Sequence, residues 1–349
     1  MSVLTTAVNF PPSIPLSELG IYTPESLDSF CASESKQPWV VEGLISKGSV
    51  NITVGDSGLG KSPLLYQLAL CIAAGIPWLG SPTTRGTVVY FDLENSELDS
   101  QAIRNDLLRH LGLKHCPDNF LVRFDGDKGA MHKIVQSLQP ALVIIDSLRT
   151  YDPTTEKGNT EAGITMNAFR KLAHTHGTAF NAVHHIKKPD EKNGVVSLEH
   201  AERAMVWLNQ ACGARALINQ ADFRLGIDAA VANFIKADAN PGTEEAALVI
   251  RGHRRVRGEY GPLYIARCFD DDSGDPIGYR TLSGVEMLLP EQRAAFEILP
   301  RTFSFKQAKA VYGRKDQASS DFLNKCVRLG LVIRPARGRY EKALAHPAE

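Results

Sequence analysis

The stretch GDSGLGKSPLLYQLALCIAAG, residues 55–75, follows the apolar run VNITV and carries the fold prediction for the chain. It begins with the pattern G-x-x-x-x-G-K-[ST], in which glycines let backbone N–H groups converge on an anion. The preceding residues are mostly β-branched, and the following apolar run ends at a glycine, which indicates a strand, a loop and a helix. Such a strand, loop and helix N-terminus form a site for nucleotide phosphates.

Each part of this loop has an expected role in binding ATP and Mg²⁺. Glycines supply the bends, Lys61 should reach the terminal phosphates, and the Ser62 hydroxyl should ligate Mg²⁺. Pro63 is tolerated in the first helical turn, but it removes an N–H that could have bonded a phosphate oxygen. The predicted nucleotide-binding residues are Gly55, Asp56, Ser57, Gly58, Leu59, Gly60, Lys61, Ser62 and Pro63.

Nearly all-apolar strands alternate with helices on the C-terminal side of this loop. The expected strands lie in 85–96, 120–124, 140–147 and 178–186, and the expected helices in 98–113, 130–139 and 167–177. Further apolar runs at 223–228, 246–253 and 262–269 predict a meander that extends the sheet. The pattern is typical of an α/β fold with a mainly parallel sheet flanked by helices.

Polar residues end three of the expected strands. Asp146 ends ALVIID, where a carboxylate beside a phosphate loop can hold the water shell of Mg²⁺. The stretch VVYFDLENS places Asp92 and Glu94 at another strand end, and a glutamate there could orient and deprotonate a water. A hydrolase needs such a base, whereas a small-molecule kinase needs an acceptor site, so Glu94 favours ATP hydrolysis. The stretch AVHHIKKP ends a third expected strand, and a polar side chain at that strand end could sense the γ-phosphate.

Two apparent metal sites are rejected. His184 and His185 are neighbours on a strand and point to opposite faces, and no cluster of Cys or Asp accompanies them. The acidic run FDDDSGDP, residues 269–276, lacks the glycine and glutamate spacing of a calcium loop. We expect a tight acidic loop between strands there.

Bulk composition narrows the class of protein. The 349-residue chain has a formal net charge of zero, so any nucleic-acid site must be a local patch. The six cysteines are scattered without a C-x-x-C pair, which favours a reduced cytoplasmic protein. No signal peptide is recognisable, and no apolar run reaches the roughly 20 residues that span a bilayer.

A second domain is predicted beyond Pro290. Residues 291–349 hold twelve Lys and Arg against six Asp and Glu, and suggest three helices followed by a hairpin. This order is typical of a winged helix-turn-helix, with Gln317 to Leu329 as recognition helix and Arg334, Arg337 and Arg339 as wing contacts to DNA phosphate. The predicted division is an extended arm over 1–37, an α/β core over 38–285 and a winged-helix-like domain over 290–345.

Taken in this order, the motifs resemble the RecA-like ATPases, and more closely the RepA-like plasmid and phage replicative helicases. The likeness covers residues 38–270, from PWVVEGLISKGSVNITVGDSGLGKS through RGTVVYFDLENS, LVIIDSLRT and AVHHIKKP to GARALINQADFRLGI. It implies a RecA-like fold and a hexameric ring with ATP between neighbouring subunits. The roles it implies are phosphate and Mg²⁺ binding by Lys61 and Ser62, general base for Glu94, a second Mg²⁺-shell carboxylate for Asp146, and γ-phosphate sensor for His185.

Rings of this kind complete each site with an arginine from the neighbour, because the transition state gains negative charge. The run RGHRRVRGEYGP assigns that role to Arg255 or Arg257, with Arg254 as a further candidate and a solvent-facing basic hairpin as the alternative. The loop after His185 lacks the family's small-residue run. Its lysines, Lys187, Lys188 and Lys192, are candidate DNA contacts or merely solvated, and the loop over 150–163 carries no clear nucleic-acid signal.

Two functions remain open from the sequence. The first is an ATP-driven helicase or translocase that acts on single-stranded or duplex DNA in replication, with a primase or other replication proteins as candidate partners. The second is an ATP-controlled DNA-binding regulator or loader, favoured by Pro63, the atypical loop and the basic tail. A small-molecule kinase is disfavoured because no acceptor pocket is legible.

Overall fold

The computed structural model describes residues 23–25, 38–186, 197–213, 215–230, 247–256 and 258–343. The chain divides into two units, Met1–Pro38 and Trp39–Glu349. All the helices and strands named in this description lie in the second unit. Within the described residues, no helix is both long enough and apolar enough to cross a membrane.

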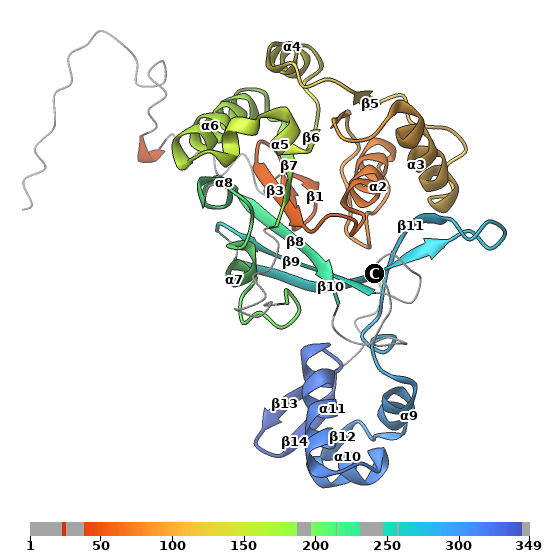
Figure 1. Ribbon diagram of the computed structural model, residues 1–349. Coiled ribbons are helices and arrows are strands. Elements are labelled where there is room, and N and C mark those ends of the chain that lie inside the picture. The colour runs from red at the N-terminus through yellow and green to blue at the C-terminus, as the bar shows by residue number, and fades with distance from the viewer. Residues whose placement is uncertain are drawn as a thin grey trace, which may run out of the picture. The chain divides into compact units, whose positions relative to one another are not determined.

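A nine-stranded sheet forms the centre of the larger unit, in the order β11-β10-β9-β8-β3-β7-β6-β4-β5 (Figure 1). Its parallel strands are β3 (Val50–Gly55), β4 (Val88–Asp92), β5 (Phe120–Arg123), β6 (Leu142–Asp146), β7 (Ala179–His185) and β8 (Phe223–Ala229). The antiparallel extension comprises β9 (Ala247–Arg254), β10 (Gly258–Phe269) and β11 (Pro276–Thr281). The predicted α/β fold class, a mainly parallel sheet flanked by helices, is confirmed. The predicted meander is confirmed in β8, β9 and β10, and β11 is an additional strand.

The parallel strands are mostly buried, and most of their residues are apolar, because both faces of the sheet are covered. In β4, Val88 and Tyr90 pack on one face, and Val89 and Phe91 on the other. The first face is covered by α2 (Lys61–Ala74) and α3 (Glu97–His110), with the small hairpin of β1 (Trp39–Val41) and β2 (Ile45–Ser46). The second face is covered by α4 (Lys128–Leu138), α6 (Asn159–His176), α7 (Ala204–Leu208) and α8 (Arg215–Gln220).

The strand order brings the polar strand ends together. Strand β3 pairs with β7, β7 with β6, and β6 with β4, all in parallel. The carboxyl ends of parallel strands meet at one edge, so the phosphate loop after β3 lies beside His185 and Asp146. Beyond β6, the chain continues through α5 (Leu148–Tyr151) and the 3₁₀ helix η1 (Pro153–Glu156).

The C-terminal elements have a hydrophobic cluster of their own, built around Phe303, Phe322 and Tyr340. They are α9 (Pro290–Ile298), β12 (Thr302–Ser304), α10 (Phe305–Tyr312), α11 (Asp316–Arg328), β13 (Val332–Ala336) and β14 (Arg339–Lys342). The three predicted helices and the hairpin are confirmed, and β12 adds a third strand in the order β12-β14-β13. The domain boundaries proposed from the sequence stay a prediction.

Candidate nucleotide-binding site

The phosphate loop runs from the end of β3 to the start of α2. Gly58 and Gly60 have φ angles of 79° and 83°, in the left-handed region that glycine enters without steric cost. Helix α2 begins at Lys61, so its N-terminal N–H groups and dipole face the loop. The Nζ atom of Lys61 donates to the carbonyls of Gly55 at 3.1 Å and Asp56 at 2.7 Å. The loop therefore encloses a positive charge.

Lys61 is buried, with 7% of its surface exposed. Burial lowers the pKa of its ammonium, and the carboxylates of Asp146, Glu94 and Asp56 oppose that shift. A cation held among carboxylates in a partly desolvated loop is well suited to bind a polyphosphate.

Asp146 and Ser62 provide oxygen atoms beside this cation. Asp146 is 1% exposed and accepts a hydrogen bond of 2.7 Å from the hydroxyl of Tyr90. The hydroxyl of Ser62 also bonds to this carboxylate, whereas burial raises the pKa of Asp146. Within the described residues no group of three or more His, Cys, Asp or Glu could hold a metal by itself. Carboxylate and hydroxyl oxygens fit Mg²⁺, which commonly takes one or two protein ligands together with substrate phosphates.

Glu94 connects the ends of three strands. It follows β4, accepts a hydrogen bond from the hydroxyl of Ser147 after β6, and lies 3.6 Å from Nε2 of His185 at the end of β7. The imidazole of His185 and then the hydroxyl of Ser147 lower the pKa of Glu94 to about 2, against burial, which raises it. Glu94 is therefore ionised at neutral pH and restrained on two sides.

The two acidic residues of VVYFDLENS have different surroundings. Asp92 is 1% exposed and accepts a hydrogen bond of 2.6 Å from the hydroxyl of Tyr66. It also accepts from the backbone N–H of Asn95 at 3.1 Å. Glu94 keeps 37% of its side chain exposed. Asp92 thus stabilises the strand end, and Glu94 is the carboxylate that can reach a water.

His184 and His185 point to opposite faces of β7, as the sequence predicted. His184 is buried, its Nε2 lies 2.8 Å from the carbonyl oxygen of Cys212, and burial lowers its pKa. The His184 ring therefore packs in the core. Of the two histidines, His185 is the one that lies beside Glu94.

Two of the candidate finger arginines, Arg254 and Arg255, lie at the other end of the sheet from the phosphate loop. Arg254 pairs with Phe223, and Phe223 pairs with Asn51 at the start of β3, whereas the phosphate loop follows the end of that strand. Arg255 donates to the carbonyl of Asn219 at 2.8 Å and forms an ion pair of 3.5 Å with Asp222. The structure therefore separates these arginines from the phosphate loop of their own chain.

Some of the predicted arginines and lysines lie within the described residues, and others lie outside them. Arg254 donates to the carbonyls of Gly43 and Glu259, at 2.9 and 3.0 Å. Arg257, Lys187, Lys188 and Lys192 lie outside the described residues. In the C-terminal hairpin, Arg334, Arg337 and Arg339 are exposed. The guanidinium of Arg334 lies 5.5 Å from the centre of the Tyr340 ring.

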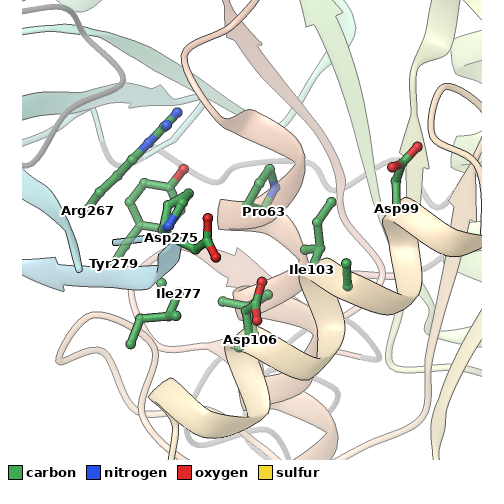
Figure 2. A pocket seen from close by; sticks show the side chains of 12 residues that line it. Pro63, Asp99, Ile103, Asp106, Arg267, Asp275, Ile277 and Tyr279 are labelled. Atoms are coloured by element: carbon green, nitrogen blue, oxygen red, sulfur yellow. The ribbon is translucent and has the colours of Figure 1, made fainter. Parts of the chain in front are cut away.

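Two residues missed by the sequence reasoning contact the phosphate loop. The hydroxyl of Tyr279, in β11, donates to the carbonyl of Gly60 at 2.9 Å, and Nη2 of Arg267, in β10, lies 3.4 Å from the carbonyl oxygen of Gly58. Figure 2 shows both side chains extending toward the helix that carries Pro63. No motif marks either residue, since single tyrosines and arginines are common on strands.

A cavity of about 490 Å³ lies beside this contact. Its lining includes Pro63 of α2, Ile103 of α3 and Ile277 of β11, with Asp275 from the acidic loop. The acidic run over residues 269–276 was predicted to be a tight loop between strands. This prediction is confirmed, because β10 ends at Phe269 and β11 begins at Pro276.

The sequence comparisons agree with this geometry. Residues 22–191 match the family model described as AAA domain. The chain is 31% identical over 165 residues to the DNA repair protein RadA of Halalkalibacterium halodurans and 27% identical over the same length to that of Bacillus subtilis. Each alignment covers 46% of this chain and 33% of the relative, so the chain spans about a third of the length of these relatives.

Two solved structures align with part of the chain. The RadB recombinase aligns with a TM-score of 0.42 and 16% identity, over 64% of this chain and 89% of RadB. The KaiC-like protein PH0186 of Pyrococcus horikoshii aligns with a TM-score of 0.43 and 10% identity, over 71% of this chain and 99% of its own. The core thus combines a phosphate loop and a mainly parallel sheet with sequence similarity to the AAA domain family model and, distantly, to the RadA DNA repair proteins.

Proposed function

We propose that this protein is a DNA-dependent ATP hydrolase, a helicase or translocase of the RepA-like type. The observation that carries the proposal is the position of Glu94, held by His185 and Ser147 at strand ends adjacent to the phosphate loop. A phosphate loop alone binds nucleotide, whereas a carboxylate that can position water adds hydrolysis.

Each side chain has a distinct part in the proposed reaction. Lys61 binds the terminal phosphates, and Ser62 and Asp146 hold Mg²⁺, which would neutralise developing charge on the phosphate oxygens. Glu94 orients the attacking water and accepts its proton. Glu94 is ionised at neutral pH because its pKa is lowered to about 2, so its carboxylate is free to accept a proton. His185, whose imidazole lies beside the carboxylate of Glu94, would sense the presence of the γ-phosphate.

The ring arrangement is supported by the place of the arginines. Arg255 is separated from the phosphate loop of its own chain by the length of β3 and β8. An arginine at this end could stabilise a transition state only at the site of another subunit. We therefore propose a homo-oligomer, a hexamer, with ATP between neighbours and with Arg255 or Arg257 supplied in trans.

The base of the nucleotide is proposed to occupy the cavity beside Pro63. This residue follows Ser62 directly, so the cavity opens next to the loop that would bind the phosphates. Apolar side chains of Ile103 and Ile277 can pack against a base, which buries its faces from water.

Steady-state ATP hydrolysis with and without single-stranded DNA tests the proposal. We expect DNA to stimulate hydrolysis, and Glu94→Gln to lower kcat by about 10²-fold or more with retained ATP binding. Glu97→Gln, an exposed glutamate in the first turn of α3, is the matched control. Equal turnover in Glu94→Gln and the wild type would refute the assigned base.

The second candidate is an ATP-controlled DNA-binding regulator or loader. The exposed Arg334, Arg337 and Arg339 in a locally basic C-terminal region favour it, as does the DNA repair role in the name of the RadA relatives. Tight ATP binding, negligible turnover with any DNA, and ATP-dependent DNA binding would support this candidate over the motor.

A further inference from the structure

The antiparallel extension of the sheet makes an unexpected contact with the phosphate loop. Tyr279 and Gly60 are 219 positions apart in sequence, yet the Tyr279 hydroxyl donates to the Gly60 carbonyl at 2.9 Å. A Cβ atom on Gly60 would collide with this hydroxyl and with the guanidinium of Arg267. The approach is therefore close enough to restrain the loop backbone.

The strand that carries Tyr279 is itself anchored to α2. The backbone N–H of Tyr279 donates to Oε1 of Gln67 at 2.8 Å, and Nε2 of Gln67 donates to the Tyr279 carbonyl at 2.9 Å. Gln67 is 3% exposed, so both bonds are shielded from water. A third contact joins α3, where Nε2 of His110 lies 3.0 Å from the same carbonyl oxygen.

Arg267 completes the contact from the neighbouring strand. Its guanidinium carbon lies 6.0 Å from the centre of the Tyr279 ring, and Nη2 lies 3.4 Å from the carbonyl oxygen of Gly58. Burial raises the pKa of the Tyr279 hydroxyl, so it keeps its proton at neutral pH and remains a donor. The two residues thus hold carbonyls on both sides of Leu59.

We propose that Arg267 and Tyr279 are positioning residues that hold the phosphate loop in its anion-binding shape. Carbonyl oxygens bonded by Arg267 and Tyr279 point away from the anion, and the N–H groups of the same loop are then presented to it. A loop preorganised in this way loses less conformational freedom on binding, which increases affinity. This inference rests on the proposed nucleotide site.

The test compares the binding of Mg-ATP and of Mg-tripolyphosphate, which lacks a base, by titration calorimetry. Tyr279→Phe removes only the hydroxyl that bonds Gly60. We expect it to weaken both ligands to a similar extent, by about threefold to tenfold. Tyr264→Phe is the matched control, because it removes a 3.1 Å bond from β10 to Glu199, and Tyr264 packs in the hydrophobic cluster on the other face of the sheet from Tyr279. We expect that variant to bind both ligands as the wild type does.

Three outcomes would overturn the inference. Tyr279→Phe could bind both ligands like the wild type. Alternatively, it could weaken the binding of ATP alone, which would mean that Tyr279 only lines the cavity and does not position the loop. A wild type that binds neither ligand would refute the nucleotide site itself, and with it the proposed role of Arg267 and Tyr279. Arg267→Gln provides an independent second variant, expected to weaken both ligands, and thermal unfolding without ligand checks that each variant is folded.

Discussion

Oε1 of Glu94 lies 3.6 Å from Nε2 of His185, although the two residues belong to strands separated by β6. The contact crosses the end of β6 just where Ser147 donates its hydroxyl to the same carboxylate. The candidate base is thus linked to the candidate γ-phosphate sensor, and a movement of the His185 ring would change the charge environment of Glu94.

This relationship predicts a pH-dependent contribution to folding. The pKa of Glu94 falls from 4.5 to about 2 in the folded chain, so ionisation favours the fold. The stabilisation is fully present above pH 4.5 and is lost as the pH falls through about 2. We expect the difference in unfolding free energy between the wild type and Glu94→Gln to shrink across that window, measured by urea denaturation. A constant difference between pH 6 and pH 3 would contradict the prediction, and Glu97→Gln serves as control.

Pro63 leads to a prediction about affinity. Pro63→Ala restores a backbone N–H in the first turn of α2, where it has no intrahelical partner and can bond a phosphate oxygen. We expect tripolyphosphate to bind about threefold to tenfold more tightly, measured by calorimetry. Pro290→Ala, at the first turn of α9, should leave binding unchanged. Unchanged or weaker binding in Pro63→Ala would show that this N–H does not face the anion.

The position of Arg255 predicts complementation between subunits. Arg255→Ala and Glu94→Gln should each abolish most hydrolysis while ATP still binds. If the arginine acts in trans, mixing the two variants restores part of the activity, because some interfaces then combine an intact Glu94 with an intact Arg255. Arg301→Ala, an exposed arginine of the C-terminal region, is expected to hydrolyse ATP normally. Mixtures no more active than their components would count against Arg255 as the finger.

The exposed arginines of the C-terminal hairpin predict a salt-dependent interaction with duplex DNA. Removing both Arg337 and Arg339 should weaken binding and reduce the slope of log K against log salt by about 2, if each contacts one phosphate. Fluorescence anisotropy over a salt series measures the slope. The control is a double variant, Lys114→Ala with Lys133→Ala, of two exposed lysines in the α/β domain. An equal loss of DNA affinity in this control would argue against a specific contact by the C-terminal hairpin.

Much of the core was predictable because its signals are local. The phosphate loop needs glycines at fixed spacing, and Gly58 and Gly60 do adopt the left-handed conformation that this spacing implies. Strands covered on both faces are mostly apolar, so their pattern indicates a parallel sheet. Parallel strands end at one edge, and the strand order β3-β7-β6 then places Lys61, His185 and Asp146 side by side there.

Other features depended on tertiary structure because they join distant segments through side chains with no distinctive spacing. The sequence assigned the base to Glu94 and not to Asp92, but only the structure shows that Tyr66 bonds to buried Asp92 and that Glu94 lies beside His185. The bond between Tyr279 and Gly60 requires β11 to be anchored on α2 by Gln67. Thus the sequence by itself determined the nucleotide loop and the class of sheet, through local backbone and burial requirements. Only the long-range packing decided which side chains contact Glu94 and which contact the phosphate loop.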